Sequence, residues 1–283
     1  MTKTSLAPRP RSRRLTRTAV VGSAAAALLL AGCGADAEAS ADALIVGTDL
    51  TYPPYAYFVG ETPSGFDPDI TAALAEELGV EAQYSDTRFE QLIPGLKAGQ
   101  FNVIASALYI TAERAQEVDF IPYFSTGNSI LVTEGSDPLA DAADLCGLTV
   151  GVIKGGDIVQ RLRTDASAEC TAAGSEPIDV REFTTDPEAT QAMLSGQLDA
   201  HVTDAAVAAS LVENDDVDVT ITSTQILYPI PVGLAVAKGD SDTKQQLEKA
   251  LEDLRSSGRY AELLDQYNLE EPNEDQIAEI LGS

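Results

Sequence analysis

The chain has 283 residues, of which 18 are Lys or Arg and 45 are Asp or Glu, so its formal net charge at pH 7 is −27. This acidic excess excludes nucleic acid as a partner, because the phosphate backbone is itself an anion. It also excludes membrane attachment through a basic patch. The length exceeds what one α/β unit needs, which indicates two lobes.

The N-terminus has the organisation of a lipoprotein export signal. An apolar run over residues 19–30 ends in Leu30-Ala31-Gly32-Cys33, and it follows six basic residues, Lys3, Arg9, Arg11, Arg13, Arg14 and Arg17. The run is shorter than the roughly 20 apolar residues of a membrane-spanning helix. Its ending resembles the lipobox of bacterial lipoproteins. We therefore expect residues 1–32 to be a signal peptide, Cys33 to be acylated after cleavage, and residues 33–42 to form a flexible tether.

Two further cysteines, Cys146 and Cys170, are expected to form a disulfide, because the signal places them outside the cytoplasm, where thiols oxidise. The alternative, metal ligation, is set aside since His201 is the only histidine and a Cys and His site could not be completed. We expect no metal and no cofactor. Cleavage before Cys33 would leave 12 basic and 45 acidic residues, a net charge of −33, so each remaining cation is informative.

Strands and helices are expected to alternate from residue 43 onward, which predicts an α/β fold with parallel sheets. In the first half, Asp67 is expected to cap a helix that has Pro68 in its first turn and ends at Gly79. A second helix is expected over residues 89–98. Strands are expected at residues 43–46, 80–84 and 101–105.

The second half restarts the same pattern. We expect strands at residues 129–133, 148–153, 178–183, 198–203 and 230–236, and helices at 158–162, 187–194 and 204–212. Ser241 is expected to cap a further helix, and a last one is expected over residues 258–267. From residue 270 the acidic tail is expected to be loosely packed.

Residues 106–120 contain the cation that organises the predicted site. Thr111 can cap a turn after a buried strand, which puts Arg114 in the first turn of a helix, where backbone N–H groups favour anions. A guanidinium there can bind a carboxylate through two parallel hydrogen bonds. The alternative is an ordinary surface arginine.

Other polar residues are expected at strand ends, where open parallel sheets bind ligands. Asp204 follows the strand at 198–203 and would lie on the second lobe, opposite Arg114 on the first. One cation and one anion across a cleft match the zwitterion of an α-amino acid. Tyr52 and Phe89 could hold the ligand side chain between two aromatic faces.

Several short motifs together resemble the solute-binding proteins of polar amino-acid ABC transporters, and the resemblance extends over residues 43–269. The motifs are Gly47-Thr48-Asp49, Tyr52-Pro53-Pro54-Tyr55, Gly65-Phe66-Asp67, Leu92-Ile93-Pro94-Gly95-Leu96, Ile110-Thr111-Ala112-Glu113-Arg114-Ala115 and Val118-Asp119-Phe120 with Pro122-Tyr123-Phe124. The resemblance implies an α/β, two-lobed, periplasmic-binding-protein-like fold of type II with two extended crossovers, near residues 124–128 and 228–232. Residues 43–126 plus 230–283 would form lobe 1, and residues 127–229 would form lobe 2.

The resemblance also implies function. Arg114 would hold the carboxylate of a free L-amino acid, Asp204 its ammonium, and Tyr52 and Phe89 its side chain. The expected partners are a cognate ABC permease with its ATPase and, through the lipid on Cys33, the membrane. The protein would be an extracytoplasmic monomer and not an enzyme.

The chain departs from the family at two places. Ala107 and Tyr109 stand where a glycine and, two positions later, a small hydroxyl residue are usual, and Gly156 stands where a threonine usually follows the glycine. These departures leave the zwitterion anchors intact, and at Gly156 the backbone N–H could remain for a ligand while the hydroxyl is lost. Asp49, Asp157 and the Tyr109 hydroxyl would suit a polar or basic side chain, although Asp49 is general in the family. The expected ligand-binding residues are Asp49, Tyr52, Phe89, Ala107, Tyr109, Arg114, Gly156, Asp157 and Asp204.

Alternatives stay open for residues and for function. The alternative for Asp204 is that it only caps its helix. The alternative for Tyr52 and Phe89 is that they are core residues. One rival function is a same-fold enzyme such as a cyclohexadienyl or arogenate dehydratase, which would use a cleft carboxylate as general acid or base. A second is a ligand-sensing lipoprotein without a transporter.

Overall fold

The computed structural model describes residues 43–282. The expected signal peptide, the expected lipid site at Cys33 and the expected tether lie outside these residues. Within the described part of the chain, no helix combines the length and the apolar character that a membrane crossing requires.

One large mixed sheet runs through the fold in the order β5-β1-β6-β12-β7-β10-β8-β9, with β11 paired to β7. Its strands are β1 (Leu44–Thr48), β5 (Ala82–Asp86), β6 (Val103–Ile104), β7 (Val118–Thr133), β8 (Thr149–Ile153), β9 (Asp179–Phe183), β10 (Ala200–Asp204), β11 (Val219–Ile221) and β12 (Leu227–Ala237). Pairing is parallel among β5, β1 and β6 and among β10, β8 and β9. The expected parallel sheets are therefore present, but β7 and β12 pair antiparallel with each other and with β10 and β6.

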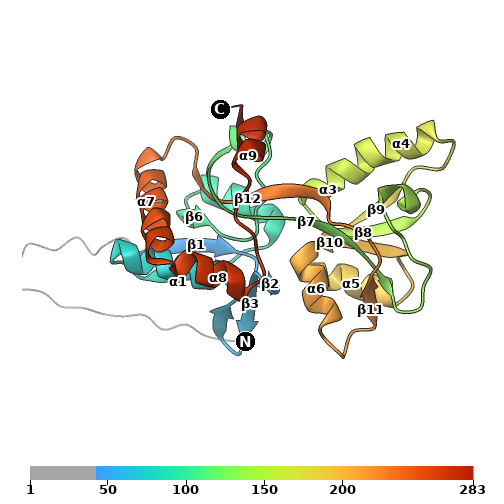
Figure 1. The fold of residues 1–283 in the computed structure, drawn as a ribbon, viewed down its shortest axis with the longest axis horizontal. Coiled ribbons are helices and arrows are strands. Elements are labelled where there is room, and N and C mark those ends of the chain that lie inside the picture. The colour runs from blue at the N-terminus through green and yellow to red at the C-terminus, as the bar shows by residue number, and fades with distance from the viewer. Residues whose placement is uncertain (1–42, 283) are drawn as a thin grey trace, which may run out of the picture. The chain divides into compact units, whose positions relative to one another are not determined.

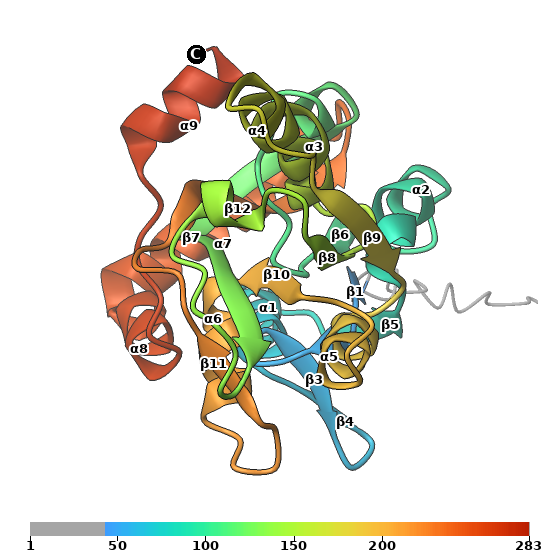
Figure 2. The same cartoon turned by 90° about the vertical axis from the view of Figure 1, so that its right-hand side faces the viewer.

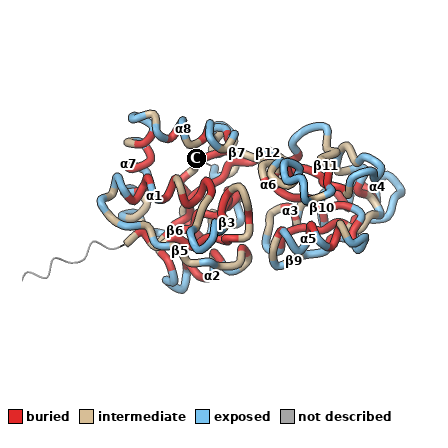
Figure 3. Tube along the Cα trace, turned by 90° about the horizontal axis from the view of Figure 1, so that it is seen from below, coloured by how far each residue is buried: buried red, intermediate tan, exposed pale blue. Residues whose placement is uncertain are grey.

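The two longest strands link two groups of elements (Figure 1). β7 has 16 residues and β12 has 11, and they contain the segments 124–128 and 228–232. The buried side chains divide at these strands: one cluster draws mainly on residues 44–124 and 230–269, and two others draw on residues 130–227. Figure 3 shows the buried chain segments inside each group. We call the elements around the first cluster lobe 1 and those around the other two lobe 2.

In lobe 2, helices cover both faces of the strands (Figure 2). Ile130 and Val132 pack with the face that carries α3 (Asp157–Gln160) and α4 (Ser167–Ala172), whereas Leu131 packs with α5 (Asp186–Leu194) and α6 (Ala205–Val212). This alternation follows from the two-residue period of a strand. A π-helical segment, Arg161–Ala166, joins α3 to α4. The helix expected over residues 158–162 is thus the start of a longer helical stretch.

In lobe 1, the helices are α1 (Phe66–Leu78), α2 (Leu92–Lys97), α7 (Ser241–Ser257) and α8 (Arg259–Gln266). Gly79 ends α1 in the left-handed conformation, as expected. The expected cap is wrong: α1 follows Gly65, and Asp67 is turned into the core, where its carboxylate accepts hydrogen bonds from the Ala107 N–H and the Tyr123 hydroxyl. The long helix expected over residues 89–98 is a 3₁₀ turn, Phe89–Gln91, followed by α2. Pro94 lies in the first turn of α2, where its missing N–H costs nothing.

One further expectation is corrected near the end of the chain. The cap of α7 is Asp240, whose carboxylate accepts from the Thr243 N–H at 3.2 Å, and not Ser241. The tail forms α9 (Glu274–Leu281), and none of the residues of this helix is buried, in agreement with the expected loose packing. Just before α9, the Ser125 N–H on β7 donates to the Glu270 carbonyl at 2.9 Å.

A separate small sheet of β2 (Thr51–Tyr52), β3 (Ala56–Val59) and β4 (Thr62–Ser64) belongs to lobe 1. Its first turn buries Tyr52 and Tyr55, whose rings stack with centroids 5.9 Å apart. This hairpin therefore brings two phenols toward lobe 2.

The structure confirms the expected disulfide between Cys146, which follows the 3₁₀ turn Ala142–Leu145, and Cys170 in α4. The bond joins residues 24 positions apart, and Cys170 is in the apolar cluster beneath α3 and α4. It therefore ties the loop before β8 to the helices that cover β8.

Replacing both cysteines by alanine should lower the free energy of unfolding by about 3–4 kcal/mol, because the open chain gains entropy over a loop of this length. Chemical denaturation of the wild type and of the Cys146→Ala, Cys170→Ala variant measures the difference. A reductant should bring the wild type to the stability of the variant and leave the variant unchanged. Equal stability of the two oxidised proteins would contradict the prediction.

Candidate functional site

A small cavity of about 20 Å³ lies where the two lobes meet, and it brings together eight of the nine residues expected to bind ligand. A cavity of this size holds about one water molecule. Asp49 alone of the expected set does not line it. The lining residues are Tyr52, Phe89, Ala107, Tyr109, Arg114, Asn128, Ile153, Gly156, Asp157, Ile158, Val202, Thr203 and Asp204.

The cation of the cavity is Arg114, which is half-buried. It lies in a single 3₁₀ turn, Arg114–Gln116, and not in the expected α-helix, although Thr111 does accept a hydrogen bond from the Arg114 N–H at 3.2 Å. Its Nη1 donates to the Tyr109 carbonyl and its Nη2 to the Gly155 carbonyl, each at 2.9 Å. The guanidinium lies 5.6 Å from the centre of the Phe89 ring. Its remaining N–H groups are available to an anion.

The anion of the cavity is Asp204, which is fully buried at the end of β10. Oδ1 accepts from the Tyr55 hydroxyl at 2.8 Å and from the Ala206 N–H at 2.9 Å, and Oδ2 accepts from the Tyr109 hydroxyl at 2.7 Å. Burial raises the pKa of Asp204, and the donors from Tyr109, Tyr55 and Ala206 oppose that rise. Asp204 caps α6, so the capping role and a place in the cavity coexist.

Two aromatic residues flank these charges. Tyr52 is 7% exposed and its hydroxyl lies 3.4 Å from Thr203 Oγ1 in lobe 2, while Phe89 is 9% exposed beside Arg114. Both are buried, as the core alternative expects, yet both line the cavity. Their rings form apolar walls between the cation and the anion.

The first turn of α3 adds polar backbone and a second carboxylate. The Gly156 N–H donates to the Ile153 carbonyl at 3.3 Å, so the turn itself uses the group that was expected to remain for a ligand. Asp157 forms an ion pair with Arg161 at 2.5 Å, and its charge opposes the lowering of the pKa of Arg114 that burial causes. Asp157 is thus partly neutralised before any ligand arrives.

Asp49 lies outside the cavity and contacts the turn that carries Phe89. Its carboxylate accepts from the Phe89 N–H at 2.9 Å and pairs with Arg88 at 2.8 Å. Its carboxylate is thus already paired within lobe 1 and does not reach the cavity. It holds the turn that carries Phe89.

Sequence reasoning missed three polar residues of the site. Thr203 donates to Asp186 Oδ2 at 2.6 Å, Asn128 faces the Tyr109 hydroxyl at 3.4 Å, and Tyr55 binds Asp204. Tyr55 belongs to the Tyr-Pro-Pro-Tyr motif, and Thr203 directly precedes Asp204. Both residues could therefore have been predicted from their neighbours in the sequence. Asn128 gives no local signal, because its place follows from pairing with Asp204 across β7 and β10.

Comparison with known proteins decides the family. The profile described as bacterial extracellular solute-binding proteins, family 3, matches residues 44–270. The chain belongs to this family. Its fold is the two-lobed, type II periplasmic-binding-protein-like fold of the family's solved amino-acid-binding members.

The solute-binding protein has relatives of known name. It is 32% identical over 234 residues to the L-arginine-binding protein of Pseudomonas aeruginosa strain PAO1, covering 78% of this chain and 86% of the relative. It superposes with a TM-score of 0.72 on an ancestral arginine-binding protein bound to arginine, with 35% identity and coverage of 80% and 97%. It also superposes, with a TM-score of 0.67, 31% identity and coverage of 80% and 95%, on an ancestral amino acid-binding protein described as a precursor of cyclohexadienyl dehydratase.

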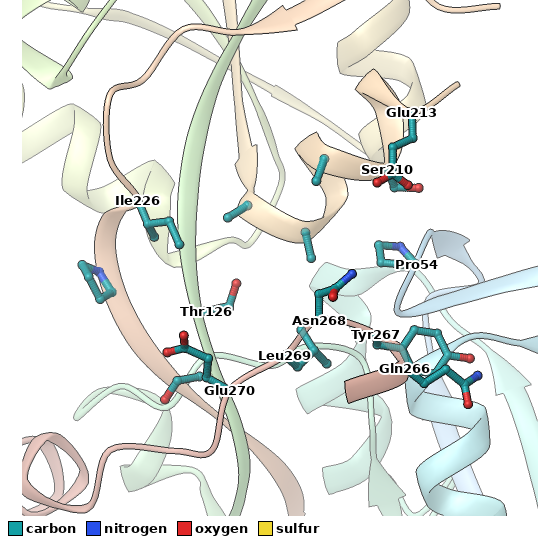
Figure 4. A pocket seen from close by; sticks show the side chains of 15 residues that line it. Pro54, Thr126, Ser210, Glu213, Ile226, Gln266, Tyr267, Asn268, Leu269 and Glu270 are labelled. Carbon is teal, nitrogen blue, oxygen red and sulfur yellow. The ribbon is translucent and has the colours of Figure 1, made fainter. Parts of the chain in front are cut away.

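A larger cavity of about 530 Å³ lies near the crossovers, between α6 and residues 266–270 (Figure 4). Its carboxylates, Glu213 and Glu270, are exposed, and its lining contains no Lys or Arg. It therefore offers no pair of opposite charges. Among residues 43–282, no group of three or more His, Cys, Asp or Glu side chains is arranged to hold a metal ion.

Asp67 holds the loop that carries Tyr109. Its Oδ2 accepts from the Ala107 N–H at 3.1 Å, and Ala107 has a positive φ of 45°, which is unusual for a residue with a side chain. Asp67 is fully buried, and this burial raises its pKa to about 7. A carboxyl group whose pKa rises on folding stabilises the fold below about pH 4, and this contribution is lost as the pH rises to about 7.

Asp67→Asn should equal the wild type in stability near pH 4 and exceed it by up to about 4 kcal/mol above pH 7, because the amide resembles the protonated carboxyl. Denaturant unfolding across this pH range measures the difference. The matched control is Asp242→Asn, which removes one charge from the exposed first turn of α7. Parallel wild-type and Asp67→Asn curves would show that Asp67 does not titrate in this range.

Proposed function

We propose that this protein is an extracytoplasmic receptor that binds a free L-amino acid between its lobes and delivers it to a cognate ABC permease and its ATPase. The observation that carries the proposal is the presence of Arg114 from lobe 1 and Asp204 from lobe 2 on one buried cavity. An α-carboxylate would bind Arg114, and an α-ammonium would bind Asp204. Both pairs would be shielded from water, where the loss of one partner is costly.

The proposed mechanism is hinge closure about β7 and β12. Ligand would enter with the lobes apart, because the cavity has room for only about one water molecule. Closure would then add the contacts of the second lobe. Such a change follows from binding only if the ligand contacts the closed state better than the open one, and two anchors on different lobes supply that difference.

The names of the relatives support an amino acid with a polar or basic side chain. One curated relative and one solved structure are named for arginine. In this chain Asp157 is the carboxylate that remains for a cationic side chain, and it would exchange part of its pairing with Arg161. The lipobox-like ending at Cys33 supports attachment to the cell membrane through lipid.

We propose binding without turnover. The two carboxylates of the cavity, Asp157 and Asp204, are both engaged by hydrogen-bond donors or by an arginine. A general acid or base needs free access to the proton that it transfers. Turnover of arogenate or prephenate by the purified protein would overturn this part of the proposal.

A thermal-shift screen of the twenty standard L-amino acids tests the function directly. A ligand present at 100 times its Kd should add about 2.7 kcal/mol of stability, which raises Tm by about 5–10 °C in a protein of this size. We expect a hit among the basic or polar amino acids. If no amino acid raises Tm, the proposed function is wrong.

Arg114→Ala should weaken amino-acid binding at least 100-fold, because the ligand carboxylate would be buried without its charge partner. Isothermal titration calorimetry with the best ligand of the screen measures the loss. The control is Arg163→Ala, which removes an arginine that pairs with Glu182 on the surface of lobe 2. Unchanged affinity in Arg114→Ala, with the fold intact, would remove Arg114 from the site.

A further inference from the structure

Tyr109 reaches from lobe 1 to the carboxylate that is proposed to receive the ligand ammonium. Its hydroxyl lies 2.7 Å from Asp204 Oδ2 and 3.1 Å from the Gly127 carbonyl, and the residue is 8% exposed. The hydroxyl has one hydrogen to donate, and the shorter contact is the one to the charged acceptor. A group of the protein itself therefore occupies one of the acceptor positions of the anion.

The backbone fixes Tyr109 in this position. It pairs with Val232 on β12, and the next residue, Ile110, donates its N–H to the Pro231 carbonyl at 2.9 Å. The Tyr109 carbonyl also accepts from Arg114 Nη1. One residue thus contacts both the proposed carboxylate anchor and the proposed ammonium anchor.

An arriving ammonium meets an anion that is already largely satisfied. A carboxylate offers about four acceptor positions, and Tyr55, Ala206 and Tyr109 use three of them at Asp204. Of these donors, Tyr109 lines the cavity, whereas Tyr55 and Ala206 do not. The cavity of about 20 Å³ cannot hold an amino acid, so the lobes must separate, and the bond between Tyr109 and Asp204 must break, before a ligand enters.

We propose that Tyr109 competes, within the molecule, with the ligand ammonium for Asp204, and so sets how much affinity the side chain of the ligand must add. The inference rests on the proposed amino-acid binding. The phenol–carboxylate bond stabilises a closed form that contains no ligand, and this form cannot bind an amino acid. The apparent affinity therefore falls in proportion to the fraction of molecules that remain able to bind. An amino acid is retained only when its side-chain contacts, added to the zwitterion, exceed this competition.

The test compares Tyr109→Phe with Tyr55→Phe, which remove the two phenols that face the same carboxylate. Each variant keeps its ring, and each should unfold at a lower temperature than the wild type without ligand, because a hydrogen bond to a charged group is lost. Tyr109→Phe should nevertheless bind the amino acid about tenfold or more tightly. Tyr55→Phe should show no gain in affinity, because Tyr55 lies outside the cavity.

A variant that is less stable without ligand but binds the amino acid more tightly shows competition, whereas a purely structural or ligand-contacting tyrosine would not give tighter binding when its hydroxyl is removed. The probes are the twenty standard L-amino acids, tested one at a time on the wild type and both variants by thermal shift and calorimetry. Equal or weaker binding by Tyr109→Phe, with the wild type binding, would overturn the competition and leave the proposed function standing. If neither the wild type nor Tyr109→Phe bound any of them, both proposals would be wrong.

A spectroscopic readout covers the case in which Tyr109→Phe does not fold. The chain has nine tyrosines and no tryptophan, so its ultraviolet difference spectrum at wavelengths above the phenylalanine bands reports mainly tyrosine. Saturating amino acid should perturb the tyrosine spectrum of the wild type and of Tyr55→Phe, since the Tyr109 phenol leaves a charged partner. Ligand binding without this perturbation would overturn the competition.

Discussion

The contact between the two lobes centres on the solvation of one buried carboxylate. Asp204 has no exposed surface, and an ion removed from water costs several kcal/mol unless hydrogen bonds replace the lost water. The N-terminus of α6 supplies one donor, and lobe 1 supplies two through Tyr55 and Tyr109. The closed arrangement of the lobes therefore solvates Asp204 with protein groups, and opening returns it to water.

The sheet brings this carboxylate to the junction of the lobes. β10 lies between β7 and β8, and Asp204 pairs with Asn128 on β7, one of the two strands that connect the lobes. Arg114 belongs to lobe 1 and is oriented by the carbonyl of Tyr109. Because each proposed anchor belongs to a different lobe, occupation of both anchors would require closure, and neither lobe alone offers both charges.

The sequence predicted much of the fold and most of the cavity. The alternation of strands and helices within each half followed from the hydrophobic periods, and the charges at Arg114 and Asp204 were recognisable because cations are few and the anion follows a strand. Local patterns could not assign Asp67, since its position before Pro68 suits a cap equally well, and only the packing of Ala107 shows where its carboxylate points. Asp49 was misplaced for a similar reason: its partners, Arg88 and Phe89, are distant in sequence. Cavity volume alone would select the cavity of about 530 Å³ over the smaller one, although the larger cavity lacks a pair of opposite charges.

The same carboxylate determines how selectivity can arise. If Asp204 were bare in the empty closed form, any zwitterion would gain the full benefit of its ammonium and would be retained with little help from its side chain. Here two phenols and an N–H already hold the anion, so an ammonium that replaces one phenol gains only the difference between a charged and a neutral donor. This contribution is common to all amino acids and cancels from the difference between any two of them, but the smaller it is, the fewer amino acids reach an affinity at which they are retained. In the proposed site, the side chain would supply the remaining affinity through contacts with the walls formed by Tyr52, Phe89 and α3.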